Sequence, residues 1–217
     1  MINILCYGDS NTYGYDPRSG DRYPRDVRWT GVLKSLLGES FNVIEEGCNG
    51  RTTVFVDPEE EWKCGLPYLK PCLNTHKPVD IVCMMLGTND LKTFYGASAA
   101  DIANGAGKLV DTIFEFSSKK GLPMPIVILM SPPEIGEDIE DSYFSYEFDR
   151  SAIERSKEFP REYGRVADEK DCVFFDAAKY AKASKEDSLH LTTEGHRNIA
   201  EALAKVITDI YGEETDE

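Results

Sequence analysis

The sequence predicts an α/β domain in which helices cover both faces of a five-stranded parallel sheet, a three-layer α/β/α sandwich. Five short apolar runs, all but the second nearly continuous, resemble strands that are buried on both faces. Helical patterns separate these runs, and strand–helix alternation favours parallel strands joined by right-handed crossovers. The expected strands are 3–7, 42–46, 79–86, 125–130 and 172–176.

Apolar residues at 3–4 spacing predict three helices. These are one from Trp29 that stops at Gly38, one that follows Ser98 and stops near Gly121, and one that begins at Thr192 or Thr193 and ends at Gly212. In the second helix, Asp101 lies three residues after Ser98, which is a variant of the capping box. Segments 57–78 and 131–150 are expected to be irregular, and the second is acidic and aromatic. Long loops in a compact domain are often lids or contact surfaces.

Length and charge limit the classes of protein that fit. With 217 residues, 41% of them hydrophobic, the chain suits one domain over 1–212, followed by an acidic tail at 213–217 that is expected to be disordered. The formal net charge is −15, from 39 acidic and 24 basic residues. Phosphate backbones and anionic lipid surfaces repel such a chain, so nucleic acid and membranes are not expected partners.

The cysteines and the N-terminus indicate a cytoplasmic, thiol-reduced protein. The six cysteines form no CxxC pair and have no nearby pair of histidines, so no metal site is predicted. The chain starts directly with a strand rather than with a charged and then apolar leader. No apolar stretch approaches the roughly 20 residues of a membrane-spanning helix.

Polar residues follow the expected strands at the edge where ligands bind in parallel α/β sheets. The first strand runs into Gly8-Asp9-Ser10-Asn11 and the second into Gly47-Cys48-Asn49-Gly50-Arg51. The third runs into Gly87-Thr88-Asn89-Asp90, and Asp187-Ser188-Leu189-His190 follows the fifth. Each segment alone is ordinary turn composition, but their shared position predicts a catalytic site.

The residue types at this edge suit acyl transfer by a serine nucleophile. A serine hydroxyl needs an adjacent base, and a histidine titrates near neutral pH. A carboxylate must hold that imidazole in the right tautomer. Ser10, His190 and Asp187 are therefore predicted to be nucleophile, base and acid, with Glu186 as the alternative acid.

The tetrahedral intermediate of such a reaction also needs hydrogen-bond donors for its oxyanion. A tight turn after the first strand would expose the backbone N–H of Ser10. Gly50 lacks a side chain and would let a second N–H approach, and Asn89 offers a neutral NH₂ group. Gly47 is the alternative glycine after the second strand.

The four segments match, in chain order, the sequence blocks of the SGNH (GDSL-type) hydrolases: Gly8-Asp9-Ser10, Gly50, Gly87-Thr88-Asn89-Asp90 and Asp187-Ser188-Leu189-His190. The resemblance implies a flavodoxin-like sandwich and ester hydrolysis without metal or cofactor. It maps the nucleophile to Ser10, the oxyanion donors to Gly50 and Asn89, and the base and acid to His190 and Asp187. Asn11 is a departure, because the GDSL pattern has leucine there.

Further segments resemble the arylesterase/acyltransferase (perhydrolase-like) branch of that class. They are 27–33, 43–47 with 51–53, and 85–90. The branch implies small acyl esters as substrates, acyl transfer to alcohols or peroxide, and homo-oligomers.

Other polar and aromatic residues near these segments have alternative roles. Tyr13 and Tyr15 follow the nucleophile and would line the acyl pocket or pack in the core. Arg51 would orient a substrate or form a structural salt bridge with the acidic surface. Two histidines, His76 and His196, are expected to be exposed. Asp9 and Asp90 are expected to bond within their own turns.

Two other functions remain open from the sequence. A carbohydrate O-deacetylase would use the same machinery, with the aromatic segment 131–150 as a sugar platform. A non-catalytic flavodoxin-like domain would bind a nucleotide or flavin, but no Gly-x-Gly-x-x-Gly loop follows the first strand.

Overall fold

The predicted five-stranded parallel sheet is confirmed. The computed structural model describes residues 1–212, so the predicted disorder of the tail 213–217 lies outside the described residues. The strands are β1 (Ile2–Gly8), β2 (Phe41–Gly47), β3 (Ile81–Met85), β4 (Ile126–Ser131) and β5 (Val173–Asp176). Their order is β2-β1-β3-β4-β5, and every neighbouring pair is parallel.

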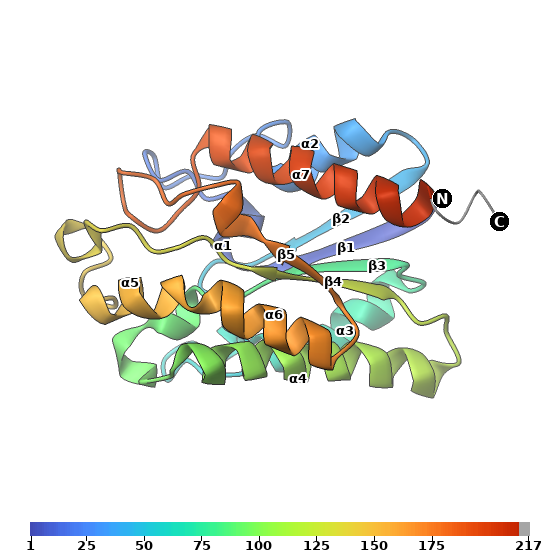
Figure 1. Cartoon of the computed structure of the whole chain (residues 1–217), viewed down its shortest axis with the longest axis horizontal. Helices are drawn as coiled ribbons and strands as arrows, with labels where there is room; N and C mark the ends of the chain where they lie inside the picture. The colour runs from blue at the N-terminus through green and yellow to red at the C-terminus, as the bar shows by residue number, and fades with distance from the viewer. Residues whose placement is uncertain (213–217) are drawn as a thin grey trace.

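Helices cover both faces of this sheet (Figure 1). They are α1 (Ser10–Tyr13), α2 (Trp29–Leu37), α3 (Gly65–His76), α4 (Ala99–Lys120), α5 (Arg150–Lys157), α6 (Phe159–Glu169) and α7 (Thr193–Gly212). Short 3₁₀ helices are η1 (Glu61–Lys63), η2 (Asn89–Leu91), η3 (Thr93–Tyr95), η4 (Ile139–Asp141) and η5 (Ala177–Lys179). Helices α2 and α7 lie on one face, and α3, α4 and α6 lie on the other. No helix in the described part of the chain has the length and apolar character needed to cross a bilayer.

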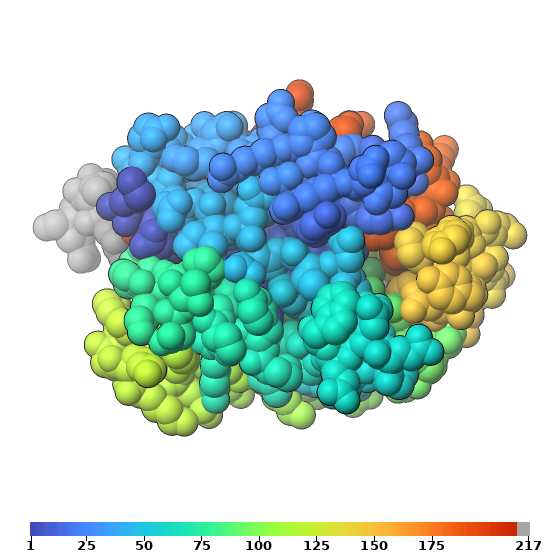
Figure 2. Space-filling view, turned by 180° about the vertical axis from the view of Figure 1, so that it is seen from behind, coloured from blue at the N-terminus to red at the C-terminus, as the bar shows by residue number. Residues whose placement is uncertain are grey.

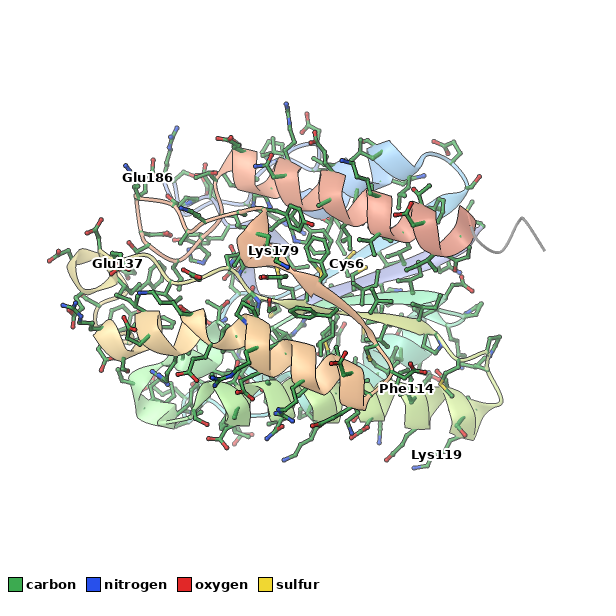
Figure 3. The ribbon with its side chains drawn as sticks, in the orientation of Figure 1. Cys6, Phe114, Lys119, Glu137, Lys179 and Glu186 are labelled. Atoms are coloured by element: carbon green, nitrogen blue, oxygen red, sulfur yellow. The ribbon has the colours of Figure 1, made fainter. Side chains whose placement is uncertain are left out.

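Two hydrophobic cores follow from the alternation of side chains along buried strands. In β1, Leu5 and Tyr7 join the core beneath α3, α4 and α6, whereas Ile4 and Cys6 join the core beneath α2 and α7. Figure 3 shows Cys6 at the sheet. All six cysteines are free thiols.

The helix ends predicted from the sequence are present. The Ser98 side chain caps α4 by accepting a hydrogen bond from the Asp101 N–H, and the Asp101 carboxylate accepts one from the Ser98 N–H. Gly121 ends the helix in the left-handed region at φ +63°, where glycine has no Cβ penalty. Gly38 and Thr193 mark the end of α2 and the start of α7.

The prediction that 57–78 is irregular is wrong, because α3 occupies its second half. Pro67 lies in the first helical turn, where a missing N–H costs little, and Pro71 is accommodated inside the helix. Leu69, Cys72 and Leu73 are buried and stabilise the helix through packing. Tertiary packing here outweighs the low helix propensity of proline.

Helices α5 and α6 were not predicted as elements. In α6, Phe159, Tyr163, Val166 and Ala167 form a buried stripe at helical spacing among charged residues. Between the end of β4 and the start of α5, residues 132–149 contain only the short helix η4, in agreement with the prediction that 131–150 is irregular. This loop and the loop before α7 lie at the carboxyl ends of the strands, where Figure 3 labels Glu137 and Glu186.

Candidate active site

The nucleophile candidate begins a short helix directly after β1. Asp9 is the N-cap of α1, and its Oδ1 accepts a hydrogen bond from the Asn11 N–H at 2.9 Å. Gly14 ends this single turn in the left-handed region at φ +88°. Ser10 therefore occupies the first position of α1, with 6% of its surface exposed.

Ser10, His190 and Asp187 form a continuous hydrogen-bonded chain. The His190 Nε2 lies 2.9 Å from the Ser10 Oγ, and the His190 Nδ1 lies 2.6 Å from the Asp187 Oδ2. These three side chains come from opposite ends of the sequence, and all are buried. The geometry is that of a nucleophile, a base and an orienting carboxylate.

A tight turn places Asp187 and His190 together. The second carboxylate oxygen of Asp187, Oδ1, accepts hydrogen bonds from the backbone N–H groups of Leu189 (3.0 Å) and His190 (2.9 Å). Ser188 adopts a left-handed φ of +58°, and its carbonyl accepts from the Gly136 N–H at 2.8 Å. The long segment 131–150 thus supports the turn from outside.

Asn11 fixes the other side of the histidine loop. Its Oδ1 accepts from the Leu191 N–H at 3.0 Å, and its Nδ2 points to the Leu189 carbonyl at 3.5 Å. A leucine in this position could make neither bond. The departure at Asn11 therefore has a structural reason: this side chain connects α1, which begins at Ser10, to the residues on both sides of His190.

The carboxyl partner of His190 is Asp187 rather than Glu186. Burial alone would raise the pKa of Asp187, but the hydrogen bonds and the charge of His190 outweigh it and lower that pKa. Asp187 is therefore ionised at neutral pH. Glu186 instead contacts Arg18 and the Ser184 hydroxyl, away from the imidazole.

The three residues predicted to supply oxyanion donors, Ser10, Gly50 and Asn89, line the same cavity. Gly50 has a φ of +76°, a left-handed conformation that side chains rarely adopt, which explains the glycine. The Asn89 Nδ2 donates to the Arg51 carbonyl at 3.1 Å, which orients the amide.

Gly47, the alternative to Gly50, has a packing role. A Cβ on Gly47 would lie 2.1 Å from the Tyr13 backbone nitrogen. Gly50, by contrast, lines the same cavity as Ser10 and Asn89. The close approach of β2 to α1 therefore accounts for Gly47.

Two buried carboxyl groups lie beneath the site. Asp9 bonds within its own turn, as expected, whereas Asp90 accepts from the Thr53 N–H and hydroxyl on the loop after β2. Asp90 thereby connects the loops that carry Gly50 and Asn89. Burial raises the pKa of Asp9 to about 7 and that of Asp90 to about 6.

These raised pKa values predict a pH-dependent stability. Between the ordinary value of 3.8 and about 7, Asp9 holds more proton in the folded than in the unfolded chain. The free energy of unfolding therefore falls as pH rises through this window and levels off above it. Asp9→Asn, which mimics the protonated form, should raise that free energy at pH 8 by up to about 4 kcal/mol and have little effect at low pH. Thermal unfolding of both proteins at pH 4 and pH 8 measures this, and an equal effect at both pH values would contradict it.

A cavity of about 340 Å³ opens over Ser10 and His190. Tyr15 lines it with its ring centroid 4.2 Å from that of His190, and the Phe144 ring lies 5.3 Å from the same imidazole. Further lining residues that the sequence reasoning missed come from loops far apart in the chain. They are Asn49, Glu60, Trp62, Lys63, Lys92, Glu147 and Leu189.

The structure corrects the expectations for Tyr13 and Arg51. Neither lines this cavity. The Arg22 guanidinium lies 4.4 Å above the Tyr13 ring. Arg51 is 5% exposed and donates to the backbone carbonyls of Gly8 and Glu46, so it joins the ends of β1 and β2 instead of orienting a substrate or forming a surface salt bridge.

The expectations for the two histidines are also corrected. His196 is fully buried, its Nδ1 accepts from the Trp29 N–H at 3.3 Å, and burial lowers its pKa to about 3. His76 is only partly exposed, and its Nε2 lies 2.7 Å from the Glu46 Oε1. Helix periodicity alone does not indicate whether the face of α7 that carries His196 is buried or exposed. The polar residue type therefore led to the prediction of an exposed position.

Comparison with solved structures identifies close relatives. The aryl esterase of M. smegmatis is 36% identical, with a TM-score of 0.91, over 96% of this chain and 99% of that one. Est24, a carbohydrate acetylesterase from Sinorhizobium meliloti, is 34% identical, with a TM-score of 0.91, over 97% of this chain and 100% of that one. No curated protein matches the chain.

The family comparison agrees with the resemblance drawn from the four sequence blocks. Residues 6–197 match the GDSL-like lipase/acylhydrolase family, a range that includes every block from Ser10 to His190. This match favours a hydrolase over a flavin- or nucleotide-binding domain. The chain belongs to the GDSL-like lipase/acylhydrolase family and is a hydrolase that acts on esters.

Proposed function

We propose that the protein hydrolyses small acyl esters through a covalent acyl-Ser10 intermediate. The observation that carries this proposal is the hydrogen-bonded chain from Asp187 through His190 to the Ser10 Oγ. This hydrogen-bonded chain ends at a cavity that Gly50 and Asn89 also line, which supports their proposed role as donors.

The first half-reaction transfers the acyl group to the enzyme. As the Ser10 Oγ attacks the ester carbon, the His190 Nε2 takes the hydroxyl proton, and Asp187 stabilises the resulting imidazolium. The N–H groups of Ser10 and Gly50 and the second amide hydrogen of Asn89 stabilise the oxyanion. The intermediate then breaks its bond to the alcohol oxygen, which receives the proton from His190.

The second half-reaction releases the acyl group. His190 takes a proton from water, whose oxygen attacks the acyl carbon, and the bond to the Ser10 Oγ breaks as that oxygen regains a proton. An alcohol in place of water gives acyl transfer by the same steps. Asp187 has the same orienting role in both halves.

Asn89→Ala is expected to lower kcat by about 10²–10³-fold, because it removes one oxyanion donor from the transition state. KM should change little. Steady-state kinetics with p-nitrophenyl acetate measure both constants. Asn49→Ala is a matched control, since Asn49 lines the same cavity without a proposed role at the oxyanion. An equal loss in the two variants would contradict the assignment.

Rates with p-nitrophenyl acetate, butyrate and octanoate test the proposed acyl length. Tyr15 and Phe144 lie against the His190 ring and limit the space beside the nucleophile. The acetate should therefore be cleaved fastest. Faster cleavage of the octanoate would overturn the small-acyl part of the proposal without affecting the nucleophile.

A second candidate is a carbohydrate O-deacetylase, favoured by the chemistry of the cavity lining. The exposed rings of Trp62 and Tyr146 line the cavity with two ion pairs, Lys63 with Glu60 and Lys92 with Glu147. Aromatic faces and charged hydrogen-bonding groups together suit the apolar faces and hydroxyls of a sugar. Est24 is a relative that is named a carbohydrate acetylesterase.

Acetylated xylose and phenyl acetate separate these two functions. If a sugar binds against Trp62, Trp62→Ala should raise KM for acetylated xylose while leaving KM for phenyl acetate unchanged. Tyr143→Ala is the control, because Tyr143 is 78% exposed and does not line the cavity. Absence of activity on acetylated xylose in the wild-type protein would remove this candidate.

A further inference from the structure

A second group of reactive side chains lies outside the catalytic site, between β2 and α3. Glu46 is near the end of β2, and Cys72 and His76 are one turn apart on α3. One ligand-type atom from each side chain lies within 4.8 Å of the other two. Within residues 1–212, this is the one such group of three residues that includes a thiol, an imidazole and a carboxylate.

The carboxylate of this group is already held in place from two sides. The Glu46 Oε1 lies 2.7 Å from the His76 Nε2, and the Tyr68 hydroxyl donates to the Glu46 Oε2 at 3.2 Å. Tyr68, Cys72 and His76 follow one another at four-residue intervals, so they share one face of α3. The Tyr68 hydroxyl is not itself one of the three, and a hydrogen bond from such a neighbour to a ligand side chain is typical around protein-bound metals.

Burial places the thiol behind two accessible ligands. Cys72 is 1% exposed, whereas the side chains of His76 and Glu46 are 26% and 19% exposed. Figure 2 shows the face where the turquoise surface of α3 borders the light-blue surface of β2 and its neighbours. An ion could therefore arrive from solvent past the imidazole and carboxylate and reach the sulfur behind them.

The donor set matches the chemistry of zinc. Zinc binds thiolate, imidazole nitrogen and carboxylate oxygen at about 2.0–2.3 Å, which in a tetrahedron separates the ligand atoms by about 3.4–3.6 Å. To bind zinc, the His76 Nε2 and the Glu46 Oε1 must move apart from their present distance of 2.7 Å. The Cys72 sulfur already lies within 4.8 Å of both atoms, so rotation of the side chains is the only movement required. Two anionic ligands and one neutral imidazole also balance the charge of a divalent ion.

We propose that Glu46, Cys72 and His76 bind a zinc ion, with water as the fourth ligand, and that the ion joins α3 to the edge strand β2. This site is separate from the ester-hydrolysing machinery and needs none of it. Binding replaces the thiol proton of Cys72 and the hydrogen bond between His76 and Glu46. The proton is released to solvent, so affinity rises with pH.

Without metal, burial raises the pKa of the Cys72 thiol to about 12, and the same side chain packs in the core under α3. The contrasting interpretation is that Cys72 serves only packing and that His76 and Glu46 form only a hydrogen-bonded pair. The two interpretations differ in one observable, a metal–thiolate bond at Cys72.

Cobalt(II) titration of chelator-treated full-length protein detects that bond directly. Wild type should develop a thiolate-to-cobalt charge-transfer band with tetrahedral visible bands, and zinc should displace the cobalt. Cys72→Ser should lose the charge-transfer band, and Cys48→Ser should keep it, since Cys48 is a half-exposed thiol after the same strand but outside the group. A wild type without the band, or a Cys72→Ser variant that retains it, would overturn the proposal.

Thermal unfolding gives an independent readout. Zinc at about 100 times its Kd should raise the Tm of wild type by about 5–10 °C. His76→Gln should lose this rise while it keeps hydrolysing p-nitrophenyl acetate, which shows that the variant is folded. An equal rise in wild type and His76→Gln would contradict the assigned ligands. Both outcomes are independent of whether Ser10 is the nucleophile.

Discussion

Ser10→Ala is expected to lower kcat on p-nitrophenyl acetate by a factor on the order of 10⁶. The variant removes the only atom that would become covalently bonded to the acyl group. The fold should be unaffected, because the hydroxyl contributes one hydrogen bond, to His190, at the cavity surface. Steady-state rates and Tm measured on the same preparation test both halves of the prediction.

Ser131→Ala is a matched control for this variant. Ser131 also lies at the carboxyl end of a strand, is fully buried and makes one side-chain hydrogen bond, to Asp176. It should keep wild-type turnover. Residual activity of Ser10→Ala within tenfold of wild type would refute the assignment of the nucleophile.

Asp187→Asn is expected to lower kcat by about 10⁴-fold. An amide in place of the carboxylate can donate to the His190 Nδ1, which favours the tautomer whose proton lies on Nε2 and cannot take the Ser10 proton. It also leaves the imidazolium without a negative partner. Kinetics at several pH values separate this loss from a simple shift of the optimum.

Glu186→Gln tests the alternative acid from the neighbouring position. Glu186 contacts Arg18 on the surface and has no contact with His190, so turnover should stay within about twofold of wild type. The opposite pattern, a large loss in Glu186→Gln and a small one in Asp187→Asn, would mean that the loop is arranged differently during catalysis.

The strand pattern of the sequence was sufficient to predict the sheet, because buried parallel strands carry a strong apolar signal. Ser98, Asp101 and Gly121 likewise predicted the ends of α4 through local hydrogen bonding. Helix α3 was not predicted because Pro71 has a low helix propensity. Packing of the buried face of α3 against the sheet explains why the helix forms. Helix α6 had a detectable stripe, from Phe159 to Ala167, that the sequence reasoning did not use.

The candidate site was predictable in part for a related reason. The residues of the proposed triad lie in short segments whose composition indicates their chemistry before folding. The cavity wall has no such signal: Trp62, Lys92 and Glu147 come from three loops and converge only in the folded chain. Arg51 shows the reverse error, since a charged residue beside the site turned out to hold two strand ends together.

The central claim is that Ser10 is the nucleophile of an ester hydrolase, and active-site labelling tests it most directly. The intact protein is treated with a serine-directed organophosphonate while p-nitrophenyl acetate hydrolysis is followed, and the adduct is then located by peptide mass mapping. We predict that activity is lost in step with one adduct per chain, on Ser10. Full labelling at another residue, or full activity after Ser10 is labelled, would contradict the mechanism.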